Sequence, residues 1–139
     1  MRTIKWLALA AGAILILSCF FPWVLIESKN IIVSGVSSEG TSFGKPGYLH
    51  IFFTILFFIF LSFNRVWGYR TNLIIAAFNM GWALRNFILI PACEGGECPQ
   101  KQLALYITVL SSLALLITSF FGGALRPAKK DIHDINPVP

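Results

Sequence analysis

Two cysteines in a short glycine-rich turn are the residues of this sequence best suited to carry chemistry. Cys93 and Cys98 flank positions 94–97 in the stretch ACEGGECPQ, which separates two long apolar runs. Such a pair can form a disulfide, exchange electrons with another thiol, or contribute to a zinc site together with His50 and a glutamate. Zinc-binding pairs favour two intervening residues, whereas this pair has four, and an oxidising compartment favours the disulfide. We therefore predict a structural disulfide between Cys93 and Cys98.

Asparagines form a second pattern, in the third apolar run. Asn72, Asn79 and Asn86 recur every seven residues, so on a helix they fall along one stripe. A polar stripe on an apolar helix is expected to face protein, where each asparagine can hydrogen-bond to a neighbouring helix. We interpret the stripe as a packing seam of a helix bundle, with a pathway for a solute as the alternative.

Arg85 lies beside this stripe, about 9 Å from the outer end of the run at ~1.5 Å per residue. A charge at that depth of a membrane helix is a candidate functional residue, although arginine is long enough to reach the membrane surface. Glu27 is a candidate ion-pair partner, and Glu94 and Glu97 are others. The alternative is that Arg85 binds an anionic lipid headgroup or a carboxylate of a partner subunit.

The sequence shows no catalytic constellation. Its two histidines, His50 and His133, are predicted to lie on opposite sides of a membrane. No apolar run contains a pair of carboxylates, and neither a phosphate-binding glycine loop nor an HExxH zinc motif occurs. We therefore expect no catalytic residues, no metal and no cofactor.

The elements that must position these residues are four long apolar runs. Hydrophobic residues make up 56% of the chain and charged residues 12%. Soluble domains usually contain about 25% charged residues, so an ordinary globular protein is excluded. The runs are predicted as transmembrane helices at 4–26, 49–67, 72–92 and 102–125, each close to the length of roughly 20 residues that crosses a bilayer. They form one predicted domain over 1–126, followed by a cytoplasmic tail at 127–139.

The distribution of basic residues predicts the orientation of this bundle. Seven lie near the chain termini or in the turn 64–72, whereas three lie in the loop 27–48 or the turn 93–102. The positive-inside rule therefore places both termini in the cytoplasm and the segments 27–48 and 93–102 outside. The net charge of +5 is not gathered into a groove or an arm, so we expect no nucleic-acid partner.

The loop 27–48 is predicted to form part of a small outer cap. It contains the β-branched segment NIIVSGV, followed by a stretch dense in turn-forming residues. We expect a short β-hairpin within 27–48, next to the turn that the disulfide closes.

A redox role for the cysteine pair is the main enzymatic alternative. In its four apolar runs, outward-facing cysteines and Arg85, which could hold a quinone carbonyl, the chain is similar to the DsbB-like and vitamin K epoxide reductase-like membrane oxidoreductases. It departs from them because they need two cysteine pairs, one of them CxxC, whereas Cys19 has no obvious mate here.

Together these patterns predict an all-α membrane protein, a four-transmembrane-helix bundle with both termini inside and a small outer loop cap. The favoured function is a non-catalytic accessory or scaffold subunit that packs against a larger membrane protein complex. We expect membrane lipids and a larger integral membrane protein, or further copies of the chain, as partners in a bacterial inner membrane. The alternatives are a quinone-linked thiol-disulfide oxidoreductase using Cys93 and Cys98, and a small carrier or lipid-binding protein using the asparagine stripe and Arg85.

Overall fold

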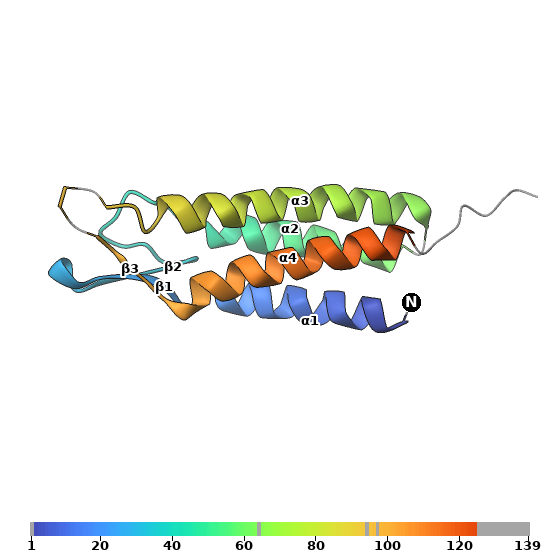
Figure 1. Cartoon of the computed structure of the whole chain (residues 1–139), viewed down its shortest axis with the longest axis horizontal. Coiled ribbons are helices and arrows are strands. Elements are labelled where there is room, and N and C mark those ends of the chain that lie inside the picture. The colour runs from blue at the N-terminus through green and yellow to red at the C-terminus, as the bar shows by residue number, and fades with distance from the viewer. Residues whose placement is uncertain (1, 64, 94, 97, 125–139) are drawn as a thin grey trace, which may run out of the picture.

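The computed structural model describes residues 2–63, 65–93, 95, 96 and 98–124. Four helices lie side by side along the long axis, and a small three-stranded sheet closes one end (Figure 1). The N-terminus lies at the end opposite the sheet. The elements are, in chain order, α1 (Arg2–Ser18), β1 (Pro22–Ile26), the 3-10 helix η1 (Glu27–Lys29), β2 (Ile31–Ser34), α2 (Gly47–Ser62), α3 (Val66–Leu89), β3 (Gln100–Lys101) and α4 (Leu103–Ala124).

The prediction of a four-transmembrane-helix bundle is wrong, although four α-helices do form within the described ranges. Among the described residues, one segment, Leu103–Gly123 within α4, is long and apolar enough to cross a membrane. Helix α1 has 17 residues and helix α2 has 16 residues. Each is therefore about 25 Å long, which is less than the roughly 30 Å thickness of a hydrocarbon core. Helix α3 is longer, but Arg70, Arg85 and its asparagines make it too polar.

The first apolar run ends as a helix at Ser18, not at Ile26, because the chain turns there and continues as a strand. Strand β1 pairs with β2 in antiparallel register, with Val24 opposite Val33. Asn30, with a φ of 53°, adopts the left-handed conformation that ends η1 and reverses the chain. The predicted hairpin is therefore displaced: β2 lies within 27–48, but β1 comes from the apolar run before it.

Strand β1 is the centre of the sheet, whose strand order is β2-β1-β3. Strand β3 pairs antiparallel to β1, with Val24 opposite Lys101. The N–H of Gln102 also donates to the carbonyl of Trp23 at 2.8 Å. The sheet thus ties the connection between α1 and α2 to the connection between α3 and α4, which fixes one end of the bundle.

Close packing at this end depends on two glycines whose backbones meet. The N–H of Gly47, at the start of α2, donates to the carbonyl of Gly35 at 2.6 Å. A Cβ added to Gly47 would lie 2.6 Å from the carbonyl carbon of Gly35, closer than real side chains approach. The absence of a side chain therefore sets how deeply α2 enters the bundle behind the sheet.

Candidate functional site

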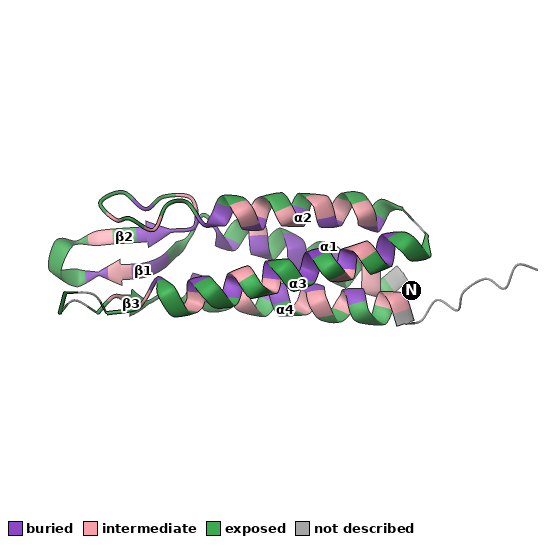
Figure 2. Ribbon diagram, turned by 90° about the horizontal axis from the view of Figure 1, so that it is seen from above, coloured by how far each residue is buried: buried purple, intermediate pink, exposed green. Residues whose placement is uncertain are grey.

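Polar side chains fill much of the interior of the bundle, whereas apolar side chains cover its outside. Figure 2 shows exposed residues along the outer faces of the helices and buried ones between them. Asn72, Asn79 and Asn86 of α3 are each only 1% exposed. We call the buried polar side chains of the four helices the polar seam; besides the asparagines it contains Ser18, His50, Thr54, Thr108, Ser111, Ser112 and Ser119.

The middle of the seam is a hydrogen-bonded cluster between α2 and α3. His50 donates from Nδ1 to the amide oxygen of Asn79. The amide nitrogen of Asn79 donates to Oγ1 of Thr54 at 3.3 Å, and Thr54 donates to the carbonyl of His50 at 2.7 Å. Because an amide oxygen can only accept, the proton of the neutral imidazole lies on Nδ1 and leaves Nε2 as an acceptor.

The surroundings of His50 keep this imidazole neutral. Its side chain is fully buried, and the ring of Trp23 stands edge-on to it at 5.9 Å between centroids. Burial lowers the pKa of His50 to about 4, although its hydrogen bond to Asn79 acts in the opposite direction. A buried, neutral histidine inside a packed bundle has no access to an external substrate. His50 therefore fits a structural role, as a hydrogen-bond donor to Asn79, and not the role of a general base.

The two ends of the asparagine stripe differ from its middle. Neither the oxygen nor the nitrogen of the Asn72 amide has a hydrogen-bond partner within the described residues, and the same holds for Asn86. Asn72 faces a cavity of about 20 Å³, which Thr118 and Ser119 of α4 also line. The stripe therefore combines one asparagine that is hydrogen-bonded with two whose amides have no partner in the described part of the chain.

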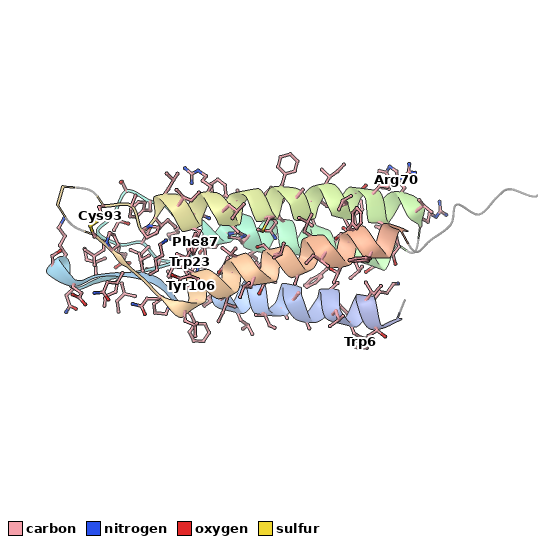
Figure 3. The ribbon with its side chains drawn as sticks, viewed as in Figure 1. Trp6, Trp23, Arg70, Phe87, Cys93 and Tyr106 are labelled. Carbon is pink, nitrogen blue, oxygen red and sulfur yellow. A yellow bond between two sulfur atoms is a disulfide. The ribbon has the colours of Figure 1, made fainter. Side chains whose placement is uncertain are left out.

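The seam also joins α1 to α4. The hydroxyls of Ser18 and Thr108 lie 2.8 Å apart and share a hydrogen bond. Trp23 donates from Nε1 to the carbonyl of Ser18 at 2.9 Å, which holds its indole over the end of α1. Trp23, Phe87 and Tyr106 all lie at the junction of the helices and the sheet (Figure 3).

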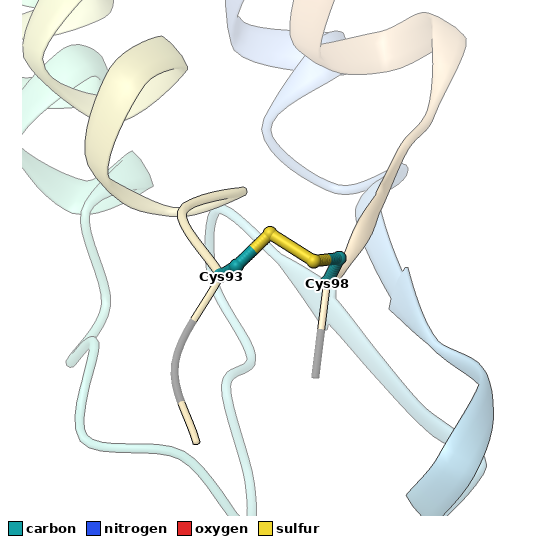
Figure 4. Close-up of a disulfide and its surroundings, with 2 residues drawn as sticks. All are labelled: Cys93 and Cys98. Carbon is teal, nitrogen blue, oxygen red and sulfur yellow. A yellow bond between two sulfur atoms is a disulfide. The ribbon is translucent and has the colours of Figure 1, made fainter. Parts of the chain in front are cut away.

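The predicted disulfide between Cys93 and Cys98 is confirmed (Figure 4). Gly95 has a φ of 61° and Gly96 a φ of 85°, and together they supply the left-handed turn between the cysteines. Because both thiols are used in this bond, they are not available to a zinc ion, and Nδ1 of His50 is hydrogen-bonded to Asn79.

The third cysteine of the chain has no redox partner. Cys19 is buried, and its thiol lies 3.3 Å from the carbonyl of Leu15. Burial raises the pKa of Cys19 to about 12, so its thiol is protonated and unreactive near neutral pH. A relay of electrons between two cysteine pairs therefore cannot form within this chain, which has three cysteines.

Arg85 and Glu27 each have another partner. The guanidinium of Arg85 lies over the ring of Trp82, with its carbon 4.7 Å from the ring centroid. Trp82 in turn donates to the carbonyl of Pro46 at 3.0 Å, which fixes the ring. Glu27 accepts a hydrogen bond from the side chain of Gln100 at 2.8 Å. The other two candidate partners of Arg85, Glu94 and Glu97, and the predicted tail 127–139 lie outside the described residues.

Sequence reasoning missed His50 and Thr54 as partners of the asparagine stripe. The two residues are one helical turn apart on α2, a spacing that places them on the same face. That spacing was the available signal, but the identity of the facing residue depends on how α2 and α3 align. A proposed function must therefore account for three features: the polar seam, the turn that the disulfide closes, and the apolar outer surface.

The chain was compared with protein-family models, with curated proteins and with solved structures, and none of them matches it. Its function must therefore be argued from its own residues.

Proposed function

We propose that this protein is a small, non-catalytic accessory subunit of a membrane protein complex, with α4 as its membrane-crossing helix. The observation that carries the proposal is the apolar outer surface of the helices. More than half of the surface of each of several large apolar side chains is exposed, among them Trp6, Leu17, Phe52, Phe78 and Phe120. Proteins that remain alone in water rarely expose apolar surface on this scale.

Helix α4 supports a membrane location. Fewer than half of the residues in its segment Leu103–Gly123 are buried, whereas the core helix of a water-soluble protein is mostly buried. Leu103, Leu110 and Ile117 recur every seven residues and are 74%, 63% and 47% exposed. On a helix this spacing places them along one outer stripe. Lipid chains or an apolar partner would cover such a stripe at no cost in desolvated polar groups.

The outer faces of the other helices support a protein partner. Trp6 of α1, Phe52 of α2 and Phe78 of α3 lie on different helices and are each exposed. Because α1 and α2 are too short to cross a hydrocarbon core, we assign the cover of these faces chiefly to a larger membrane protein. Membrane lipids and further copies of the chain are the other candidate covers.

The sheet end fits the role of a rigid outer platform. In this proposal it faces the oxidising side of a bacterial inner membrane, where the exposed bond between Cys93 and Cys98 is maintained, and the N-terminus lies in the cytoplasm. The three-stranded sheet fixes the two connections at this end relative to each other, and the disulfide closes the turn between α3 and β3. Such a platform suits docking of a partner's outer domain better than turnover.

The geometry gives less support to the two alternatives. A quinone-linked thiol-disulfide oxidoreductase would need a second reactive cysteine pair, and Cys19 is a buried, protonated thiol. A carrier that uses the asparagine stripe would need a chamber of solute size beside it, and the cavity at Asn72 has a volume of about 20 Å³. An accessory role requires neither feature.

The test is to purify the tagged full chain from its native membranes in mild detergent and to determine the stoichiometry of the particle by native mass spectrometry. We expect the chain to resist alkaline carbonate extraction and to co-purify with one membrane protein in a fixed ratio. The double variant Leu110→Glu/Ile117→Glu should lose this membrane retention. Ser42→Glu, in an exposed part of the outer loop, is the matched control and should behave as the wild type.

Two results would overturn the proposal. One is a chain that is recovered as a monodisperse monomer in buffer without detergent. The other is a detergent-extracted monomer that carries no stoichiometric partner even after cross-linking in intact membranes.

A further inference from the structure

A small cavity lies beside Asn72, near the end of the bundle opposite the sheet. The cavity has a volume of about 20 Å³ and is lined by residues of all four helices. Its polar lining includes Asn72 of α3 with Thr118 and Ser119 of α4. A water molecule needs a cavity of roughly 10–15 Å³ by the same measure, so this one accommodates one small ligand.

Asn72 has unsatisfied hydrogen-bonding groups that such a ligand can bind. Its side chain is 1% exposed, and both its amide oxygen and its amide nitrogen lack a hydrogen-bond partner among the described residues. An amide offers two donor hydrogens and an acceptor oxygen, and leaving all of them desolvated lowers stability. An occupant that accepts a hydrogen bond from the Asn72 nitrogen removes part of this cost.

The hydroxyls on the other wall narrow the choice further. Thr118 and Ser119 donate their protons to the carbonyl of Leu115, at 3.0 and 2.8 Å. Towards the cavity they consequently offer lone pairs, which accept hydrogen bonds. An anion cannot donate to these oxygens, and a metal cation cannot accept from the Asn72 nitrogen. Lys5 and Tyr69, which also line the cavity, take part in other interactions.

We infer that this cavity is the binding site of a single buried water molecule that hydrogen-bonds Asn72 of α3 to the hydroxyl oxygens of Thr118 and Ser119 on α4. The water accepts from the Asn72 nitrogen and donates to one or both hydroxyls, so it carries the seam across the α3–α4 interface. The inference is independent of the proposed membrane role, because it depends only on the cavity and its lining.

The direct test is water-to-amide cross-relaxation in the full-length, ¹⁵N-labelled protein. We expect the side-chain NH₂ of Asn72 to show a strong negative NOE to a long-lived water. The NH₂ of Asn79, which donates to Thr54, is the matched control and should show none. The absence of a cross-peak at Asn72, or an equal cross-peak at both amides, would overturn the site.

A thermal double-mutant cycle gives a second readout. If the water is bound, Asn72→Leu lowers Tm by about 3–5 °C, and Ser119→Ala costs less in that background than in the wild type. If the cavity is dry, leucine replaces an unsatisfied amide by apolar atoms, and Tm rises instead. Replacing chloride by nitrate in the buffer should leave the wild-type Tm unchanged, and a Tm that rises with chloride would assign the site to an anion and refute the water.

Discussion

Asn79 and Asn72 lie on the same stripe of α3 and are equally buried, yet of the two only Asn79 has hydrogen-bond partners among the described residues. The difference comes from the facing helices. Opposite Asn79, α2 places two side chains within hydrogen-bonding distance: His50 donates to the Asn79 amide and Thr54 accepts from it. Around Asn72, α2 contributes Phe57 and Leu61 to the cavity wall, and α4 contributes hydroxyls whose protons are already used.

This comparison separates two properties of a buried polar residue. The helical period decides that an asparagine faces inward, but the facing helix decides whether it is satisfied by protein or by water. The middle of the seam is a cluster of directly bonded side chains, so a change there should be costly. At the two ends there is no direct protein bond to lose among the described residues, so substitutions should be milder.

The largest effect should follow from removing the central asparagine. Asn79→Leu leaves the buried Nδ1 proton of His50 without its acceptor, and it removes the amide nitrogen that donates to Thr54. We expect the free energy of unfolding to fall by about 3 kcal/mol, measured by denaturant titration. Asn86→Leu, which removes an amide without protein partners in the described chain, is the matched control and should change it by less than about 1 kcal/mol. Equal losses in both variants would contradict the distinction between middle and end.

The free energy of unfolding should also depend on pH, by a similar amount, through His50 in the middle of the seam. Burial lowers the pKa of His50 to about 4, below the ordinary value of 6.5 that it regains on unfolding. The unfolded chain therefore binds the proton first as pH falls, so stability decreases between pH 6.5 and about 4, by up to about 3 kcal/mol. Above pH 6.5 the stability that depends on neutral His50 is fully present, and below about pH 4 protonation of His50 lowers the free energy of unfolding no further.

The measurement is urea unfolding across this pH range for the wild type and for two variants. His50→Gln keeps a donor for Asn79 but does not titrate, so it should flatten the wild-type profile between pH 6.5 and about 4. His133→Gln removes the other histidine of the chain and should leave the profile unchanged. A wild-type profile that survives in His50→Gln would assign the dependence to other groups.

Sequence patterns were informative where the cause is local. The seven-residue spacing of Asn72, Asn79 and Asn86 correctly predicts that they share one buried face. The glycine-rich turn between Cys93 and Cys98 correctly predicts that the two cysteines can form a disulfide. Sequence patterns failed at Pro22–Ile26, because a continuous apolar run has no period that separates a strand from a helix. That segment becomes a strand through pairing with β2 and with the distant β3. The role of His50 was missed for the same reason, since Asn79 lies 29 residues away.

The next effect tests whether the depth of α2 sets the alignment of the central cluster. Gly47 begins the helical turn that carries His50, and a methyl group there would overlap the backbone of Gly35. Because backbone cannot move aside as a side chain can, Gly47→Ala should lower the free energy of unfolding by about 2 kcal/mol. Gly81→Ala, on α3 with no atom within 4 Å of the new methyl group, should instead be neutral or slightly stabilising. Denaturant titration of both variants measures the contrast, and an unchanged Gly47→Ala protein would show that α2 can shift without loss.

The smallest effect should come from the disulfide, and it should stay at the sheet end. The bond closes a loop with a sequence separation of 5, so chain-entropy arguments allow at most about 2 kcal/mol for Cys93→Ser/Cys98→Ser. The hydrogen bonds of Asn79 do not pass through this turn, so amide exchange should accelerate around β3 and the end of α3 while the residues near His50 keep their protection. Hydrogen exchange read by mass spectrometry separates the two regions. If protection against amide exchange near His50 falls as much as it does at β3, the alignment of α2 and α3 in the seam depends on the turn that the disulfide closes. The middle of the seam would then be stabilised from the sheet end as well as by its own hydrogen bonds.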